Sequence, residues 1–353
     1  MWLLSLALGA TPADAQAACK GGSAKACVEA GVAYEGGYDV PVDLKRAADL
    51  YKEACGMGLP SGCTSFAWLA EHGKGMKADV KGAVALYEQA CEDEDPRACN
   101  NLARLAAGSD DARARTYYEK ACSGGYKDAC PKLGMLWEFG RGGPKDPGRA
   151  YAIYRASCDD HFANGCTAVG HAMRDGVGIA PDPLGAAGHF DIGCRHGDPL
   201  GCSLLGDMHK DGEGVRQDDA PPVQLYTKAC DGGALDGCTS LGTMALMGRG
   251  TALDERKALA LFQRTCDAGH PRGCSNLGYL YEHGKAVAKD PSRAWSLYDT
   301  GCRGGHPMGC TNLGLLTARG EGTDKDVPEA RTYFQQACTL GDRNGCELGE
   351  KAW

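Results

Sequence analysis

The sequence contains none of the short motifs that define common hydrolases and nucleotide-binding enzymes. Ser-x-x-Lys and Lys-Thr-Gly, the signature set of serine β-lactamases, are missing, as is the Gly-x-Ser-x-Gly nucleophile turn. So are the zinc-binding His-Glu-x-x-His pair and the phosphate-binding Gly-x-x-x-x-Gly-Lys-Ser/Thr loop. Beyond the first residues, no apolar run approaches the length of a membrane-spanning helix. These absences leave no motif-defined catalytic site and favour a binding or scaffold protein.

The chain also lacks a concentration of charge of one sign. Its 38 Lys and Arg against 46 Asp and Glu give a formal net charge of −8 at pH 7, spread without long runs. A nucleic-acid-binding surface needs a basic stripe, so no nucleic-acid partner is expected. The acidic balance favours a solvated surface, and it leaves a basic protein partner open.

What the sequence does contain is a regular set of cysteines. All 20 fall into ten pairs with seven residues between the partners; the step between pairs is 36 residues in eight of nine cases and 31 in the ninth. A fixed period of this length is typical of stacked two-helix units. We therefore predict an all-α fold, an α/α solenoid (superhelix) of helix-turn-helix repeats. The pairs are Cys19-Cys27, Cys55-Cys63, Cys91-Cys99, Cys122-Cys130, Cys158-Cys166, Cys194-Cys202, Cys230-Cys238, Cys266-Cys274, Cys302-Cys310 and Cys338-Cys346.

Each period carries the marks of two helices. Sixteen residues after the second cysteine of a pair, every full-length unit has an Asp, which can cap the first turn of a helix. An aromatic residue stands four positions before the next cysteine. Six units place a glycine inside the first helix, for example Gly134 and Gly278, at a cost of about 1 kcal/mol relative to Ala. This glycine predicts a close helix–helix contact, with the aromatic residue as its partner.

The cysteine pairs are predicted to form local disulfides. Two cysteines eight apart on one helix would have Cα atoms roughly 12 Å apart, too far for a bridge. The intervening residues are rich in Gly and Pro, as in 58–60 and 269–271, so the chain reverses and the two sulfurs meet. The alternative is metal binding, but zinc sites use closer cysteine pairs, and the nine His do not recur at one offset. We favour ten disulfides and expect no metal site.

One unit is shorter than the others. Around residues 108–111 the loop between its two helices has lost five residues. We expect this unit to be locally tighter and to lack the Gly-x-Gly…Asp segment of its neighbours.

The repeated pattern Cys-x-x-Leu-Gly…Gly-x-Gly…Asp-x-x-x-Ala-x-x-x-Tyr-x-x-Ala-Cys resembles the Sel1-like repeat, a relative of the tetratricopeptide repeat. Its cysteine-paired form is similar to the secreted Helicobacter cysteine-rich proteins. The resemblance covers residues 19–346. It implies a superhelix whose first helices line the concave side.

The same resemblance implies several activities. Some members of the family bind penicillin and hydrolyse β-lactams weakly. Others act in signalling, in host contact, or as adaptors for secretion and envelope assembly. A mitochondrial relative with paired cysteines assists respiratory-complex assembly and binds haem.

The ends of the chain lead to three expectations. Residues 1–17 have an apolar stretch followed by Ala-x-Ala and resemble a signal peptide, shortened because a basic start is missing. Residues 18–353 would form a single solenoid of about nine repeats with a short C-terminal cap, in which Trp353 has no assigned role. Because ten disulfides require an oxidising compartment, we expect a periplasmic or secreted protein.

Large residues on the outer face of the first helices are the candidate partner-binding groups. That face comprises positions two, five and nine after the second cysteine of a pair, which in most units are polar or small. A concave face bearing aromatic residues and Met would suit a peptide. The candidates are Trp68, His72, Asn101, Arg104, Met135, Phe139, Tyr279 and His283.

We expect the main partner between Trp68 and Phe139, with Tyr279 and His283 as a secondary site. The alternative is that the large side chains pack against inter-repeat loops. Asn101, and the equivalent residues at 276 and 312, could likewise bond local backbone.

The sequence thus predicts an exported, disulfide-linked monomer that binds protein or peptide partners without a cofactor. Weak β-lactamase activity and haem handling are the alternatives that the resemblance implies.

Overall fold

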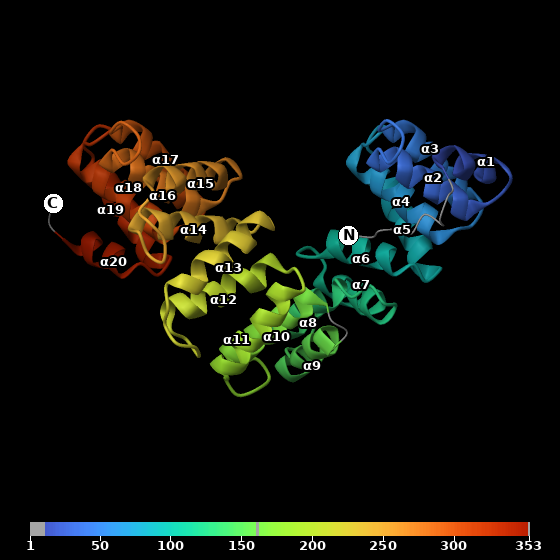
Figure 1. Ribbon diagram of the computed structural model, residues 1–353, viewed down its shortest axis with the longest axis horizontal. Coiled ribbons are helices and arrows are strands. Elements are labelled where there is room, and N and C mark those ends of the chain that lie inside the picture. The colour runs from blue at the N-terminus through green and yellow to red at the C-terminus, as the bar shows by residue number, and fades with distance from the viewer. Residues whose placement is uncertain (1–10, 160–161, 352–353) are drawn as a thin grey trace. The chain divides into compact units, whose positions relative to one another are not determined.

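The computed structural model describes residues 11–159 and 162–351, and within these ranges it is all-helical (Figure 1). The helices are α1 (Pro12–Lys20), α2 (Ala24–Gly36), α3 (Leu44–Gly56), α4 (Pro60–His72), α5 (Val80–Glu92), α6 (Pro96–Ala106), α7 (Asp111–Ser123), α8 (Ala129–Phe139), α9 (Pro147–Asp159), α10 (Ala163–Asp175), α11 (Pro183–Arg195), α12 (Pro199–Asp211), α13 (Ala220–Asp231), α14 (Leu235–Met247), α15 (Glu255–Asp267), α16 (Pro271–His283), α17 (Pro291–Arg303), α18 (Pro307–Arg319), α19 (Val327–Thr339) and α20 (Arg343–Glu350). The predicted all-α repeat fold is confirmed.

Even-numbered helices contain the second cysteine of each pair and are called A helices here; odd-numbered helices contain the first cysteine and are called B helices. The chain forms two compact units, Met1–Ala168 with Gly176–Ala180, and Val169–Asp175 with Pro181–Trp353. From α1 to α9 in the first unit and from α11 to α20 in the second, each helix packs against the next along the chain. A helices of successive repeats also touch, as α2 does α4 and α16 does α18. Each unit is therefore an α/α solenoid.

The predicted Asp residues do start the B helices. Asp43 Oδ1 accepts a hydrogen bond from the backbone N–H of Arg46 at 3.0 Å, which satisfies a first-turn donor that the helix itself cannot pair. The same bond recurs in most other repeats. Asp218 differs, because it accepts from Ala220 N instead, just before two prolines.

The short repeat keeps its cap, contrary to the prediction that the Asp segment is lost. Asp110 Oδ1 accepts from the backbone N–H of Arg113 at 3.1 Å and is the N-cap of α7. Counted back from the following cysteine, Asp110 stands where Asp290 stands in a full repeat. The deletion therefore removes the Gly-x-Gly turn and leaves the capping position intact.

The glycine on each A helix meets the predicted aromatic residue. A Cβ on Gly242 would lie 2.6 Å from Cε1 of Phe262, and one on Gly314 would lie 2.6 Å from Cε1 of Phe334. Both rings are fully buried. Two repeats of the first unit have Ala67 and Ala103 at this position instead. Close A–B packing in each repeat is thus set by one small residue and one ring.

All ten predicted disulfides are present, and no described cysteine is free. Their Cα–Cα distances run from 4.4 Å at Cys55–Cys63 to 5.0 Å at Cys122–Cys130. Each bridge joins the end of a B helix to the start of the following A helix, as the chain reversal between them requires.

Side-chain bonds also connect A helices of neighbouring repeats. Thr64 Oγ1 on α4 donates to Asp95 Oδ2, the N-cap residue of α6, at 2.6 Å. Thr311 and Asp342 repeat this bond in the second unit. Each such pair spans 31 residues and lets one A helix complete the cap of the next.

Helix α1 includes the last six residues, 12–17, of the predicted signal segment. Thr11 caps this helix, Ala15 is buried, and Gln16 accepts a hydrogen bond from Arg46 Nη2 at 2.5 Å. The rest of the apolar stretch, residues 1–10, lies outside the described residues. At the other end α20 is a single short A helix, and Trp353 also lies outside the described residues.

Candidate functional site

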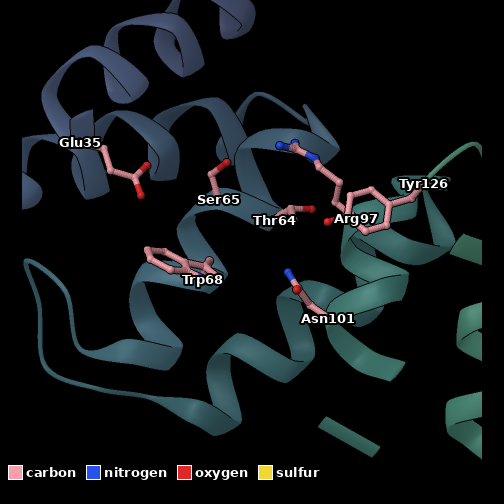
Figure 2. Close-up of a pocket in the computed structure, with 7 residues that line it drawn as sticks. All are labelled: Glu35, Thr64, Ser65, Trp68, Arg97, Asn101 and Tyr126. Atoms are coloured by element: carbon pink, nitrogen blue, oxygen red, sulfur yellow. The ribbon is translucent and has the colours of Figure 1, made fainter. Parts of the chain in front are cut away.

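A first pocket, of about 250 Å³, lies on the A helices of the first unit (Figure 2). It is bounded by α2, α4, α6 and the segment before α8. The lining residues are Glu35, Thr64, Ser65, Trp68, Arg97, Asn101 and Tyr126. Two predicted residues, Trp68 and Asn101, are thus brought together, while Glu35, Arg97 and Tyr126 come from positions that the sequence did not single out.

Hydrogen bonds fix one wall of this pocket. Glu35 Oε2 accepts from the hydroxyl of Tyr51 at 2.7 Å. Burial raises the pKa of Tyr51, and the bond to Glu35 raises it further, so the phenol stays protonated and donating. The Glu35 side chain is therefore held in place by Tyr51 where it lines the pocket.

Trp68 is partly buried. Its ring packs against the hydrophobic clusters on both sides of α4, which contain Tyr51 and Tyr87. Lys74 Nζ lies 4.2 Å above the ring centroid, and the His72 ring is 4.6 Å away. Trp68 thus contributes to packing and also presents one part of its ring to the pocket.

Arg104, although predicted as a site residue, is committed to the fold. Its Nη2 lies 2.5 Å from Oε1 of Glu71, whose side chain is only 7% exposed. Glu71 also accepts from the hydroxyl of Tyr87 at 3.0 Å. This network ties α4, α5 and α6 together, and Arg104 does not line the first pocket.

A second pocket, of about 280 Å³, lies on the A helices of the second unit. Three successive A helices, α14, α16 and α18, supply most of its wall. The lining residues are Thr243, Leu246, Met247, Phe262, Ser275, Asn276, Tyr279, Lys285, His306, Met308 and Asn312. Met247 and Met308 are both 61% exposed, so this pocket has an apolar rim that the first pocket lacks.

His306 is the unusual polar group of the second pocket. Burial lowers its pKa to about 4, helped by the nearby charges of Arg272 and His270, so the ring is neutral at pH 7. Its Nδ1 is buried and has no hydrogen-bond partner among the described residues. His270, one repeat earlier, instead uses Nδ1 to accept from Gly273 N at 3.3 Å.

The two predicted His residues pack on their aromatic neighbours. His283 stacks on Tyr279 with ring centroids 4.2 Å apart, and its Nδ1 lies 3.0 Å from the Tyr279 carbonyl oxygen. His72 makes the same main-chain contact with Trp68 at 2.9 Å. Each His thus braces a ring from one helical turn away.

Met135 and Phe139 are 51% and 60% exposed on α8. Neither lines the first or the second pocket. The structure therefore places them on the surface without joining them to Trp68.

One recurring polar contact was not foreseen from the sequence. The aromatic residue of a B helix donates its hydroxyl to an acid on the preceding A helix, for example Tyr298 to Glu282 at 2.6 Å. The same bond joins Tyr154 to Glu138 at 2.9 Å. In four repeats the signal is a Glu sixteen residues before the Tyr. Tyr226 instead donates to Asp207, nineteen residues earlier, at 2.6 Å.

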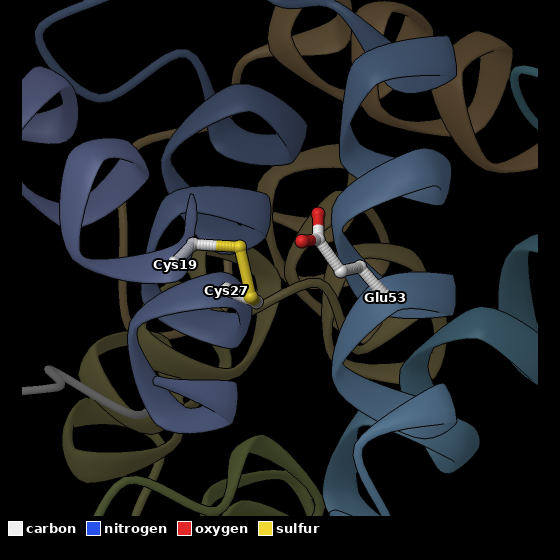
Figure 3. Close-up of side chains that lie close together, drawn as sticks. All are labelled: Cys19, Cys27 and Glu53. Carbon is white, nitrogen blue, oxygen red and sulfur yellow. A yellow bond between two sulfur atoms is a disulfide. The ribbon is translucent and has the colours of Figure 1, made fainter. Parts of the chain in front are cut away.

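A cluster of potential metal ligands is found at Cys19, Cys27 and Glu53 (Figure 3). The two sulfurs are joined in a disulfide, so neither is a thiolate, the form in which Cys binds metal. Only the Glu53 carboxylate retains ligand character. This group does not hold a metal while the disulfide is formed.

Among the described residues, no helix combines the length and apolar character needed to span a membrane. The first pocket is lined by hydroxyls, an amide, charged groups and rings, and the second also by the apolar side chains of Leu246, Met247 and Met308.

The fold and the pockets define a class of protein, the disulfide-linked scaffold of stacked helical hairpins. The chain belongs to the Sel1 repeat family, because the Sel1 repeat matches residues 24–59, 66–95, 96–126, 127–161, 199–233, 235–270, 271–306 and 307–342. This fold is used for protein interaction, and ten disulfides are typical of proteins in oxidising compartments. Comparison with curated proteins found no match.

Two solved structures agree on the fold, and a third is similar over part of the chain. A protective antigen of uropathogenic Escherichia coli strains, described as displaying an SLR fold, is 24% identical with a TM-score of 0.60, covering 95% of this chain and 73% of that one. A Sel1 repeat protein from Oxalobacter formigenes is 20% identical with a TM-score of 0.53, covering 96% and 89%. Cysteine-rich protein B of Helicobacter pylori is 30% identical over 37% of this chain and 95% of its own, with a TM-score of 0.32.

Proposed function

We propose that this chain is an exported scaffold that binds protein or peptide partners along the face of its A helices. The observation that carries the proposal is the position of the two pockets. Both use the residues two and five positions after the second cysteine: Asn101 and Trp68 in the first, Asn276 and Tyr279 in the second. From the resemblance to the family, we expect the face formed by the A helices to be the concave side of the superhelix.

The chemistry of these positions suits a polypeptide. An Asn side chain offers both a donor and an acceptor, so it can pair with a backbone amide. Trp68 and Tyr279 present partly exposed rings, the residue types that anchor protein interfaces. An amide and a ring in the same pocket can hold a peptide backbone and an adjacent apolar side chain.

Export is the second part of the proposal. Its support is the number of disulfides, since the cytosol keeps thiols reduced. Residues 1–17 remain our predicted signal peptide, and N-terminal sequencing of the protein recovered from the periplasm or the medium tests this.

Site-specific crosslinking tests the binding face. A photoreactive residue at Ser65 or at Asn276 lies in a pocket, whereas one at Gln89 lies on the exposed side of a B helix. We expect adducts with partners in an envelope extract from the first two positions and not from Gln89. Equal labelling from all three positions would contradict the proposed face.

The β-lactam and haem alternatives remain predictions from the resemblance. A nitrocefin assay on the purified protein tests the first, and the appearance of a Soret band on adding haem tests the second.

A further inference from the structure

The guanidinium of Arg97 is a cation with unused hydrogen-bonding capacity in the first pocket. Its side chain is 43% exposed, and Nη2 lies 3.5 Å from Asp95 Oδ2. That carboxylate already accepts from Thr64 Oγ1 at 2.6 Å and from the backbone N–H of Arg97 at 3.0 Å. A guanidinium carries five N–H donors, so most of them are available to a ligand.

Arg272 shows how the same repeat position behaves when its partners are internal. Both arginines stand two residues before the second cysteine of a pair. Arg272 Nη2 donates to Asp236 O at 3.0 Å and to Ser240 Oγ at 2.7 Å. Ser65 stands to Arg97 as Ser240 stands to Arg272, yet within the described chain no such bond joins Arg97 to Ser65. Ser65 was therefore available as an internal acceptor, but the Arg97 side chain lines the pocket without bonding to it.

A carboxylate of opposite sign belongs to the same pocket. Glu35 uses Oε2 for the Tyr51 hydroxyl, and among the described residues its Oε1 has no partner. Figure 2 shows Glu35 and Arg97 entering from different helices, with Ser65 between them in this view. Burial dominates the raised pKa of Tyr51, but the Arg97 charge acts to lower it, so both charges share one electrostatic environment.

The groups between the two charges suit a short peptide. Asn101 can pair with a backbone amide, and Trp68 offers a ring to an apolar side chain. The volume of about 250 Å³ is below that of drug-sized pockets, which indicates a segment of about two or three residues.

We propose that the first pocket binds a dipolar peptide segment, with a carboxylate of the ligand on Arg97 and an ammonium of the ligand on Glu35. Charge-assisted hydrogen bonds of both signs would orient the segment across Asn101 and Trp68. This inference rests on the proposed function and specifies the partner chemistry at one of its two pockets.

Calorimetric titration with four forms of trialanine tests the two charges. The forms are the free zwitterion, the N-acetylated peptide, the C-amidated peptide and the doubly blocked peptide. We expect the zwitterion to bind most tightly and each blocked end to weaken binding by about tenfold. A fifth probe, acetyl-Lys-Ala-Glu-amide, carries the charges on side chains and shows whether termini or side chains supply them.

Two conservative variants show which end of the peptide each charged residue binds. Arg97→Gln should abolish the penalty for amidation but keep the penalty for acetylation, and Glu35→Gln should do the reverse. Glu35→Gln retains an oxygen that can accept from Tyr51. The matched controls are Glu138→Gln, which alters the same type of tyrosine contact outside the pocket, and Arg272→Gln, which alters the same repeat position with internal partners.

The outcomes separate this inference from the proposed function. Equal affinity of the zwitterionic and doubly blocked peptides would overturn the inference, as would failure of all five probes to bind at millimolar concentration. If crosslinking from Ser65 persists in Arg97→Gln and Glu35→Gln while the peptide titrations show no preference for the zwitterion, the binding face is supported and the dipolar selectivity is contradicted. If neither Ser65 nor Asn276 gives crosslinks when Arg97 and Glu35 are unchanged, the proposed binding face is contradicted.

Discussion

The two pockets occupy the same kind of helix face but have different chemistry. The first is polar, with Arg97, Glu35 and Asn101 around one indole. The second has exposed Met247 and Met308 at its rim. Because both are built from the same kind of repeat, the difference shows that the chemistry of this helix face can change from repeat to repeat while the backbone arrangement stays constant.

The residues that hold each helical hairpin together, called the frame here, follow a fixed spacing, whereas the residues on the pocket face vary between repeats. Cysteines, capping Asp residues and the small residue under each ring recur because each one closes a local contact that every hairpin needs. The residue two positions before the second cysteine makes no contact that recurs in every repeat. It is Arg97 and Arg272 in two repeats and Met308 in another. Such positions are where the two pockets have diverged.

Reduction should have the largest effect and should not distinguish the two units. Each bridge closes a short ring and contributes about 2.5 kcal/mol in the chain-entropy description, and helices of 13 residues are marginal in isolation. We expect full reduction and alkylation to remove most of the helical circular dichroism at 37 °C. Limited proteolysis should show that both units open. An unchanged spectrum would mean that packing alone maintains the frame.

Adding one methyl group under a ring should distinguish repeats of the two units. Gly314→Ala brings a Cβ to about 2.6 Å from Phe334 Cε1 in a buried contact, so we expect a loss of about 2–3 kcal/mol in denaturant unfolding. In the first unit Ala67 already holds the equivalent position against Tyr87. Ala67→Gly should cost only about 1 kcal/mol. A Gly314→Ala variant as stable as the unmodified chain would show that the Phe334 ring adjusts freely.

Truncating the central ring of each pocket should cost more in the first unit. Trp68 packs on two hydrophobic clusters, whereas Tyr279 is 36% exposed and stacks on His283. We expect Trp68→Ala to lower stability by about 1–2 kcal/mol and Tyr279→Ala by less than about 1 kcal/mol. Phe139→Ala, at 60% exposure, is the matched surface control. A Trp68→Ala variant as stable as the control would make this ring a pure binding group.

A further expected difference is a pH dependence confined to the second pocket. His306 has a pKa lowered to about 4 by burial, against about 6.5 in the unfolded chain. Between these values the unfolded chain binds a proton that the folded chain does not, so stability falls as pH falls through this window. Above pH 6.5 the ring is neutral in both states and contributes no slope.

Urea unfolding at pH 7 and pH 4.5 measures this slope in the unmodified chain and in His306→Gln. We expect the variant to lose less stability on acidification. Identical losses would show that His306 is protonated in the folded protein without cost.

The frame could be predicted from the sequence because its contacts are local and periodic. The ten disulfides, the Asp caps and the contact between Gly278 and Tyr298 all follow from fixed spacings. Asp110 was missed because the cap was counted forward from the preceding cysteine, across the deletion, and not back from the next one.

The pockets could be predicted only in part. Trp68, Asn101 and Tyr279 were found because they stand on the outer helix face that periodicity defines. Arg97 and His306 were not, since both precede the second cysteine, at the start of an A helix, outside that face. Which large side chains share a pocket depends on three-dimensional packing, and so Met135 and Phe139 were grouped with Trp68 without support from the pockets found.

The bond from one A helix to the cap of the next sets how strongly neighbouring repeats are coupled. It joins Thr64 to Asp95, and its counterpart joins Thr311 to Asp342. At the equivalent step between α16 and α18 no such bond is found among the described residues: Ser275 Oγ donates to Pro271 O, and His306 Nδ1 has no described partner.

In a linear array whose stability is a sum of repeat and nearest-neighbour contributions, a weak link is where cooperative unfolding divides. Junctions without this bond, such as the one between α16 and α18, are therefore expected to open before those that have it. Under partial denaturation, amide hydrogen exchange should be faster around His306 than around Asp95 or Asp342.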